Sequence, residues 1–245
     1  MMATNGPAIE VKELTKFFGN HHALDGIDLS VEPGKTLAVF GPNGAGKTTL
    51  IKILASIMKP SAGEVFINGL NLKDNAELVR SRIGIVSHQI FLYSNLTAYE
   101  NLLFYSRMYD IADYKQRIYQ VVSMLGMQSR LYDRIGTLSR GMQQRFSIAR
   151  CLLHKPSIIL LDEPETGLDQ YAISMLWDTL KEDGSQKLTT VFTSHHLERG
   201  LNTCDYLIIL NRGKIAHQEP SKGLDLASLK AVYRNCTGAG GENTK

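Results

Sequence analysis

The sequence has little of what marks a secreted chain or a nucleic-acid-binding chain. Only three of its 245 residues are cysteine, and their wide spacing fits neither a zinc site nor a redox pair. Unpaired thiols favour a reducing compartment. Lysine and arginine number 27 against 24 acidic residues, without any run of like charge. The net charge of +3 is too small to indicate nucleic acid, so we expect no nucleic-acid partner.

Long hydrophobic runs are also missing. The most apolar stretches, such as residues 158–161 and 207–210, are far shorter than the about 20 residues that cross a bilayer. Residues 1–8 are small and polar, so we expect a flexible N-terminus without a signal peptide. We therefore expect a chain that does not cross a membrane by itself.

What is present is the composition of an ordinary globular domain. Hydrophobic residues make up 43 % and charged residues 21 % of the chain. Strand and helix patterns alternate at both ends, which predicts an α/β fold with a mostly parallel sheet and an N-terminal antiparallel β part. We expect one domain over residues 9–235, with a helical subdomain at about 90–155 and a flexible tail at 236–245.

Hydrophobic periodicity and turn residues divide the chain into elements. The expected strands are residues 9–18, 27–31, 36–40, 64–68, 83–87, 157–161, 188–193, 206–210 and 214–217. The expected helices are residues 49–58, 76–82, 139–153, 170–182 and 226–233, with a helical pattern from 97 to 126.

One segment has the spacing of a phosphate-binding loop, G-x-x-x-x-G-K-[ST]: Gly41-Pro42-Asn43-Gly44-Ala45-Gly46-Lys47-Thr48. It lies between an apolar strand and an amphipathic helix, as the motif requires. Glycines allow the backbone N–H groups to surround phosphate oxygens, and the helix dipole adds to the attraction. We expect Lys47 to reach the β- and γ-phosphates, Thr48 to bind Mg²⁺ and Thr49 to contact the α-phosphate. The alternative is a glycine-rich turn with an incidental lysine.

Two carboxylates, Asp162 and Glu163, follow the apolar run at 158–161. Such a strand ends at the carboxyl edge of the sheet, where open α/β sheets bind ligands. We expect Asp162 to hold Mg²⁺, directly or through water, and Glu163 to act on the attacking water as general base or polariser. The alternative is a solvated strand end before Pro164.

With these motifs the chain resembles the ATP-binding (nucleotide-binding) subunits of ABC transporters, from about residue 9 to residue 232. Leu138-Ser139-Arg140-Gly141-Met142 looks like the ABC signature, which usually reads L-S-G-G-Q. The resemblance implies a P-loop NTPase (RecA-like) core, ATP and Mg²⁺ as ligands, and Mg-dependent ATP hydrolysis coupled to transport. It also implies a second ATPase subunit, arranged head to tail with the first.

The resemblance assigns the signature to the partner's nucleotide. Ser139 and Gly141 would contact the γ-phosphate held by the other subunit of the dimer. A helix N-cap at Ser139 is the structural alternative, and we expect the residue to do both. Arg140 and Met142 stand where glycine and glutamine are usual; similar variants in the exporter branch argue against inactivation.

The resemblance also assigns three residues around the phosphates and the base. Gln89 matches the Q-loop glutamine and would touch Mg²⁺ or the attacking water, where a surface glutamine is the alternative. His195 matches the switch histidine and would hydrogen-bond the γ-phosphate, while its neighbour His196 faces elsewhere. Phe18 matches the aromatic residue that stacks on adenine, and Phe17 is the competing choice.

One further motif matches the family with a departure. Gly167-Leu168-Asp169 resembles the D-loop, and Asp169 would lie near the dimer seam. Glu165, just before it, stands where a small residue is usual.

A separate membrane subunit is implied as well, with this chain as a peripheral protein on the cytoplasmic face. In the family the membrane subunit docks near the segment after the Q-loop, here residues 90–97. The large apolar residues of this segment fit a docking groove. They fit equally well as cover for the core of the helical part.

The cargo is predicted by resemblance alone. Residues 86–89 and 95–105 are similar to haem-exporter ATP-binding subunits of cytochrome c maturation. Multidrug and polysaccharide exporter subunits share parts of these stretches. The alternative class is a soluble ABC ATPase of translation or DNA repair, but such proteins usually carry two ATPase halves or a long insertion. A binding-only regulatory subunit is disfavoured because Glu163 and His195 are both present.

Overall fold

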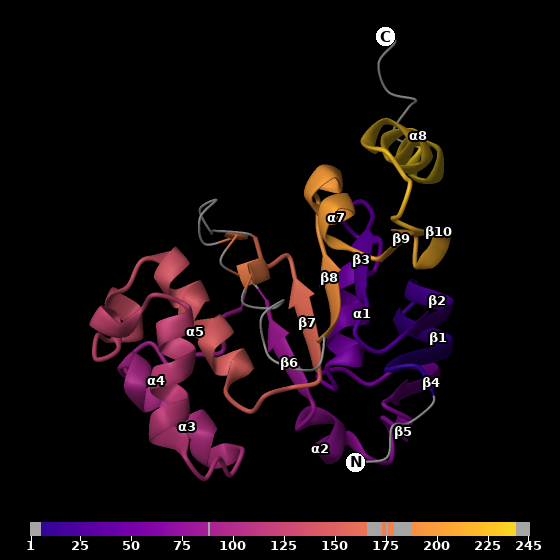
Figure 1. The fold of residues 1–245 in the computed structure, drawn as a ribbon. Helices are drawn as coiled ribbons and strands as arrows, with labels where there is room; N and C mark the ends of the chain where they lie inside the picture. The colour runs from indigo at the N-terminus through magenta and orange to yellow at the C-terminus, as the bar shows by residue number, and fades with distance from the viewer. Residues whose placement is uncertain (1–5, 88, 166–172, 175, 179–187, 239–245) are drawn as a thin grey trace.

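The chain folds into two β-sheets with helices between and beside them (Figure 1). This computed structural model describes residues 6–87, 89–165, 173–174, 176–178 and 188–238. The α/β class, the antiparallel N-terminal part and the mostly parallel sheet are confirmed.

The smaller sheet is antiparallel and has the order β2-β1-β4-β5. Its strands are β1 (Ile9–Phe18), β2 (His21–Val31), β4 (Ala62–Ile67) and β5 (Leu70–Asn71). Strand β2 begins at His21, well before the predicted start at residue 27, because Gly19-Asn20 forms a two-residue turn that pairs Phe18 with His21. The long hairpin that results carries the start of β2 back beside the end of β1.

The six-stranded sheet has the order β10-β9-β3-β8-β7-β6. Its strands are β3 (Thr36–Phe40), β6 (Ile83–Val86), β7 (Ile158–Asp162), β8 (Thr189–Thr193), β9 (Tyr206–Asn211) and β10 (Lys214–Pro220). All neighbours pair in parallel except β10, which is antiparallel to β9. The carboxyl ends of β3, β6, β7 and β8 therefore meet at one edge.

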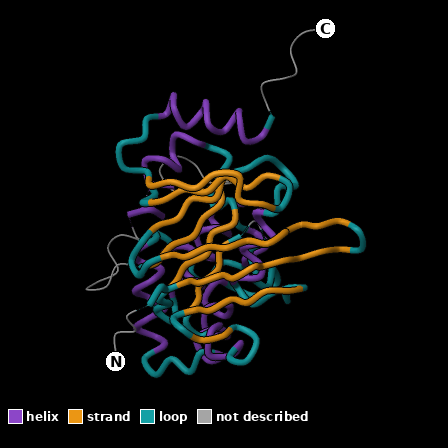
Figure 2. The backbone as a smooth tube through the Cα atoms, turned by 90° about the vertical axis from the view of Figure 1, so that its right-hand side faces the viewer, coloured by secondary structure: helices purple, strands orange, loops and turns teal. Residues whose placement is uncertain are grey.

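The central strands bury both faces, as their continuous apolar runs predict. In β3, Leu37 and Val39 belong to one core cluster, and Ala38 and Phe40 belong to the other. The first cluster lies between the two sheets and includes four of the eight residues of α1 (Lys47–Leu54). Figure 2 shows the strands of both sheets one above another, with the C-terminal helix above them. The phosphate loop that precedes α1 is thus anchored between two cores.

Three helices lie in the range predicted as a helical subdomain. They are α3 (Ala98–Met108), α4 (Tyr114–Met124) and α5 (Arg140–Leu152), with short 3₁₀ turns at Gln128–Arg130 and Ile135–Thr137. Figure 1 shows them gathered on the side away from the antiparallel sheet. Helix α3 starts with a capping box, in which Thr97 accepts from the Glu100 N–H and Glu100 accepts from the Thr97 N–H.

The remaining helices are α2 (Ala76–Arg80), α7 (Leu197–Thr203) and α8 (Leu226–Thr237). Helix α8 runs two residues into the stretch predicted as a tail, and residues 239–245 lie outside the described residues. At the other end, Ala8 is buried and its N–H bonds to Val31, so the predicted flexible N-terminus does not extend to residue 8. Most of the helix predicted at 170–182 also lies outside the described residues, but 173–174 and 176–178 are helical.

Within the described ranges, no helix combines the length and the apolar character that a membrane span requires.

Candidate active site

The phosphate-binding motif lies between β3 and α1, at the carboxyl edge of the six-stranded sheet. Gly41, Gly44 and Gly46 have φ angles of 149°, 78° and 107°. A Cβ at Gly46 would lie 2.3 Å from the carbonyl oxygen of Ala23, and one at Gly41 would lie 2.3 Å from that of Leu210. Glycine is therefore required at both ends of the loop by conformation and by space.

The loop holds its lysine through its own backbone. Lys47 Nζ donates to the carbonyl oxygens of Gly41 at 2.7 Å and Pro42 at 3.0 Å. Only 6 % of Lys47 is exposed, and this burial lowers the pKa of its ammonium group, while the carboxylates of Glu163 and Asp162 oppose the shift. The positive charge of Lys47 therefore lies close to the loop carbonyls and to the acidic pair.

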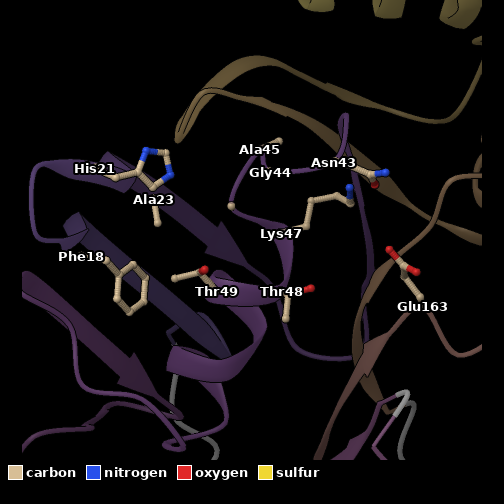
Figure 3. Close-up of a pocket in the computed structure, with 11 residues that line it drawn as sticks. Phe18, His21, Ala23, Asn43, Gly44, Ala45, Lys47, Thr48, Thr49 and Glu163 are labelled. Atoms are coloured by element: carbon tan, nitrogen blue, oxygen red, sulfur yellow. The ribbon is translucent and has the colours of Figure 1, made fainter.

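A pocket of about 270 Å³ runs along the loop (Figure 3). Figure 3 shows Phe18 at one end, Glu163 at the other, and Lys47 and Thr48 between them. The lining residues include nine that the sequence predicted for the site: Phe18, Asn43, Gly44, Ala45, Gly46, Lys47, Thr48, Thr49 and Glu163. The pocket has an aromatic end and a charged end, which suits a ligand with a base and a polyphosphate.

Asp162 lies beneath the pocket at the end of β7, with only 2 % of its surface exposed. Its Oδ1 accepts from Thr48 Oγ1 at 3.1 Å and from Thr193 Oγ1 at 3.0 Å. A hydroxyl and a carboxylate at this spacing are hard oxygen donors of the kind that Mg²⁺ prefers. The described residues contain no group of three His, Cys, Asp or Glu that could hold a metal, so such an ion also needs ligand phosphates and water.

Glu163 has a backbone φ of 51°, a left-handed conformation that non-glycine residues rarely adopt. Its N–H donates to Thr193 Oγ1 at 2.8 Å, which helps to hold this conformation. Its Oε1 lies 2.5 Å from His195 Nε2, and both side chains are partly exposed. Strain at a carboxylate that lines a pocket is typical of functional positions.

His195 and His196 have different partners. His195 contacts Glu163, whereas His196 precedes α7 and has its N–H bonded to Ser194 Oγ. His195 is not among the described residues that line the pocket, but it contacts Glu163, which does line it.

The two phenylalanines of the first hairpin have separate environments. Phe18 lines the pocket, and Lys16 Nζ lies 5.1 Å from its ring centroid. Phe17 is 49 % exposed and lies beside His22, so it is not part of the core. Two lining residues, His21 and Ala23, were not predicted. The turn Gly19-Asn20 was the available signal, since a two-residue hairpin places residue 21 opposite Phe18.

The signature residues lie elsewhere, at the start of α5. Ser139 caps this helix by accepting from the Met142 N–H at 3.3 Å, which confirms the N-cap. Neither Ser139 nor Gly141 is among the described residues of the pocket. Arg140 is exposed, whereas Met142 is partly buried and packs against the core of the helical part. This packing explains why an apolar residue stands at position 142.

Gln89 follows β6, the strand that pairs with β7. It is exposed, and it is not among the described residues that line the pocket. Its N–H donates to Ser87 Oγ at 3.2 Å.

In the segment that follows Gln89, Ile90 and Leu92 pack against the core, whereas Tyr93 is 54 % and Leu96 is 37 % exposed. Part of residues 90–97 therefore covers the core of the helical part, and part of it is exposed.

The predicted D-loop, Gly167-Leu168-Asp169, lies outside the described residues. Glu165, just before it, is described, and its Oε2 accepts from Arg199 Nη1 at 3.3 Å. This ion pair shows what the Glu165 carboxylate contacts, which the sequence did not indicate.

Comparison with known proteins agrees with this geometry. The family described as "ABC transporter" matches residues 24–166. The linearmycin resistance ATP-binding protein LnrL of Bacillus subtilis is 32 % identical over 209 residues, covering 84 % of this chain and 67 % of that protein. Nod factor export ATP-binding protein I of Cupriavidus metallidurans is 31 % identical over 220 residues, covering 89 % of this chain and 73 % of that protein.

A solved structure is similar over most of the chain. It is the dimeric post-hydrolysis state of an ATP-binding cassette bound to ADP and Pi, with a TM-score of 0.79 and 28 % identity. The match covers 88 % of this chain and all of that one. Together with the family match, the phosphate loop and the acidic pair, this shows that the chain belongs to the ABC transporter family, as an ATP-binding subunit that hydrolyses ATP to drive transport.

Proposed function

We propose that the chain powers an exporter as one of two ATPase subunits, docked on a separate membrane subunit at the cytoplasmic face. The observation that carries the catalytic part is the meeting of Lys47, Thr48, Asp162 and Glu163 at one sheet edge. A phosphate loop and a carboxylate that faces the same pocket are the groups that ATP hydrolysis needs.

The pocket orients the nucleotide from end to end. Phe18 stacks on adenine, the loop N–H groups from Gly44 to Thr48 surround the phosphates, and Thr49 contacts the α-phosphate. Lys47 leaves its carbonyl partners, which lie only 2.7 and 3.0 Å away, and turns to the β- and γ-phosphates. An ammonium group already buried beside carboxylates has little water to lose on binding.

Thr48 and Asp162 would hold Mg²⁺ together with phosphate oxygens, and Gln89 would approach from the end of β6. When bound, this ion neutralises charge that develops on the phosphates. Thr193 fixes the Asp162 carboxylate from the other side and so orients it toward Thr48.

Glu163 accepts the proton of the attacking water, and His195 sets the position of its carboxylate. The 2.5 Å contact between Nε2 and Oε1 leaves the second carboxylate oxygen free to face the pocket. In the presence of nucleotide, His195 also donates to the γ-phosphate. Because catalysis here depends mainly on positioning, a fixed general base matters more than a strong one.

Completion of the site requires a second subunit. Ser139 and Gly141 lie at the N-terminus of α5, an anion-binding position, but away from the pocket of their own chain. A similar cassette has been solved as a dimer with ADP and Pi, which supports a head-to-tail arrangement in which these residues reach the partner's γ-phosphate.

Export is favoured by the relatives. One is named for Nod factor export and another for linearmycin resistance. Haem is not named in either, so the haem cargo predicted from residues 86–89 and 95–105 rests on that resemblance alone. Exposed Tyr93 and Leu96, in the segment after the Q-loop, are the residues we assign to contact with the membrane subunit.

A pair of variants tests the catalytic assignment. Glu163→Gln keeps the shape of the side chain but loses the base, so ATP binding persists and steady-state turnover falls by at least about a hundredfold. Lys47→Ala loses charge-assisted contacts to phosphate, so calorimetry shows ATP affinity at least about tenfold weaker. Wild-type turnover in Glu163→Gln removes Glu163 as the base, and unchanged affinity in Lys47→Ala contradicts the phosphate-loop assignment.

Copurification tests the transporter assignment. The tagged chain, purified from detergent-solubilised membranes of its own host, should bring a multi-spanning membrane protein in stoichiometric amount. The identity of that protein also tests the haem prediction. Recovery from the soluble fraction with ribosomal or repair proteins contradicts the proposal, while leaving the ATP chemistry in place.

A further inference from the structure

A second contact joins the same two segments that carry Glu163 and His195. Two residues after Glu163, the carboxylate of Glu165 accepts from Arg199 Nη1 at 3.3 Å. The Glu165 side chain is 10 % exposed and that of Arg199 is 41 % exposed. A carboxylate so far removed from water requires a charged partner, and Arg199 supplies it.

The segment between Glu163 and Glu165 is stiff. Pro164 lies between them, is buried, and has its φ fixed by its ring. The Glu163 N–H is held by Thr193 Oγ1 at 2.8 Å. A force on the Glu165 side chain is therefore transmitted to the backbone that carries the Glu163 carboxylate.

The segment that carries His195 and Arg199 is also held firmly in place. Helix α7 begins directly after His196, and the Gly200 N–H donates to the His196 carbonyl at 3.0 Å. Gly200 lies against the Phe40 ring so closely that an added Cβ would be 2.3 Å from it. Phe40 is the last residue of β3, immediately before the phosphate loop. Arg199 thus projects from a helical turn fixed to the base of the phosphate loop.

We propose that Glu165 and Arg199 are positioning residues, which hold α7, and with it His195, in register with Glu163. The proposal rests on the catalytic roles proposed above. The pairs Glu163–His195 and Glu165–Arg199 bridge the end of β7 to the start of α7 at two successive points. A single contact leaves His195 free to swing about it, whereas two contacts fix the angle between the segments.

The test is a charge-exchange cycle on the purified full chain, each variant prepared with its copurifying membrane subunit. Glu165→Ala and Arg199→Ala lower kcat about tenfold, because a loss of positioning acts on the chemical step. KM for ATP stays within about twofold, since neither residue lines the nucleotide pocket as described. Glu165→Gln keeps an oxygen for Nη1 and loses less, and the reversed pair Glu165→Arg with Arg199→Glu recovers most of kcat.

A control breaks an exposed ion pair elsewhere in the chain. Asp133→Ala removes the 3.1 Å contact with Arg130 in the helical part and leaves kcat unchanged. If Arg199→Ala fails to fold, Arg199→Gln, which keeps most of the side-chain length, takes its place under the same criteria. A kcat within about twofold of wild type in either single variant overturns the proposal, because it reduces the pair to an ordinary surface contact. A reversed pair no better than the single variants overturns it as well.

Glu163→Gln, assayed in parallel, separates this proposal from the one on which it rests. Wild-type turnover in that variant removes the catalytic assignment whatever Arg199→Ala shows. A collapse of turnover in Glu163→Gln with normal kcat in Arg199→Ala keeps the catalytic assignment and removes the positioning role alone.

Discussion

Thr48 Oγ1 donates a hydrogen bond of 3.1 Å to Asp162 Oδ1, although the two residues are 114 positions apart. Thr48 lies at the start of α1, which follows β3, and Asp162 ends β7; β8 lies between these two strands in the sheet. Thr193, the last residue of β8, donates to the same carboxylate oxygen at 3.0 Å. The strand between the two motifs therefore both sets their spacing and supplies the residue that orients Asp162.

Substitutions at Gly44 and Gly46 distinguish the cost of a positive φ angle from the cost of a steric clash. Both have positive φ, but a Cβ at Gly44 meets nothing within 4 Å, whereas one at Gly46 meets the Ala23 carbonyl at 2.3 Å. Gly44→Ala should cost about 1 kcal/mol of stability, and Gly46→Ala should cost more than about 2 kcal/mol and weaken ATP binding. Urea unfolding and calorimetry measure both effects. Equal losses in the two variants contradict the close contact with Ala23.

Phe17 and Phe18 form a natural pair for testing the base contact. Both are about half exposed, but only Phe18 lines the pocket. Stacking is worth about 1–3 kcal/mol per base, so Phe18→Ala should weaken ATP affinity by about 5- to 150-fold. Phe17→Ala should leave it unchanged. Since stacking reads no base edge, GTP should lose affinity to the same degree. Comparable losses for ATP in both variants contradict the assignment of Phe18.

Two helix caps test whether Ser139 does more than begin a helix. Ser139 caps α5 and Asp225 caps α8, each by accepting a backbone N–H. Either residue changed to alanine should cost about 1 kcal/mol of stability. If the signature at the start of α5 reaches the partner's nucleotide, as proposed above, only Ser139→Ala should also lower ATP turnover. Equal turnover in the two variants reduces Ser139 to a cap.

His154 predicts a dependence of stability on pH. Its ring stacks on Tyr109 with centroids 4.0 Å apart, and Nε2 lies 3.1 Å from the Ile83 carbonyl oxygen. Burial lowers the pKa of His154 from 6.5 to about 4. The unfolded chain therefore takes up this proton first, and the contribution of neutral His154 to stability, complete above about pH 6.5, is lost as the pH falls through about 4.

The measurement compares unfolding free energies between pH 7 and pH 4.5. His154→Gln keeps a donor for Ile83 but does not titrate, so its stability should fall less steeply than that of wild type. The difference is at most one proton, or about 1.4 kcal/mol per pH unit. Identical slopes for wild type and His154→Gln exclude His154 as the titrating group.

Much of the site was readable from local patterns. A phosphate loop is a single continuous segment whose glycines answer a local backbone requirement, so Gly41 to Thr48 could be found by spacing alone. The acidic pair followed from its place at the end of an apolar run. The boundaries of helices and strands shifted by a few residues, most at β2, because hairpin pairing extends a strand beyond its alternating pattern.

Other members of the site have no local signal. Thr193 is one threonine among several, and it acquires its role only because β8 pairs Thr193 with Asp162. The partner of Glu165 lies 34 positions away on α7, and no periodicity connects the two. His21 enters the pocket through the register of the first hairpin.

The sequence by itself determined the chemistry of this protein, because a phosphate loop, a terminal carboxylate pair and a helix cap each depend on residues within a few positions of one another. Tertiary structure alone decided how these groups meet. Sheet order places β8 between β3 and β7, and the contacts of Thr193, His195 and Arg199 with the acidic segment follow from that order. Strand order is set by the packing of two cores on opposite faces of one sheet, a property that no single segment carries.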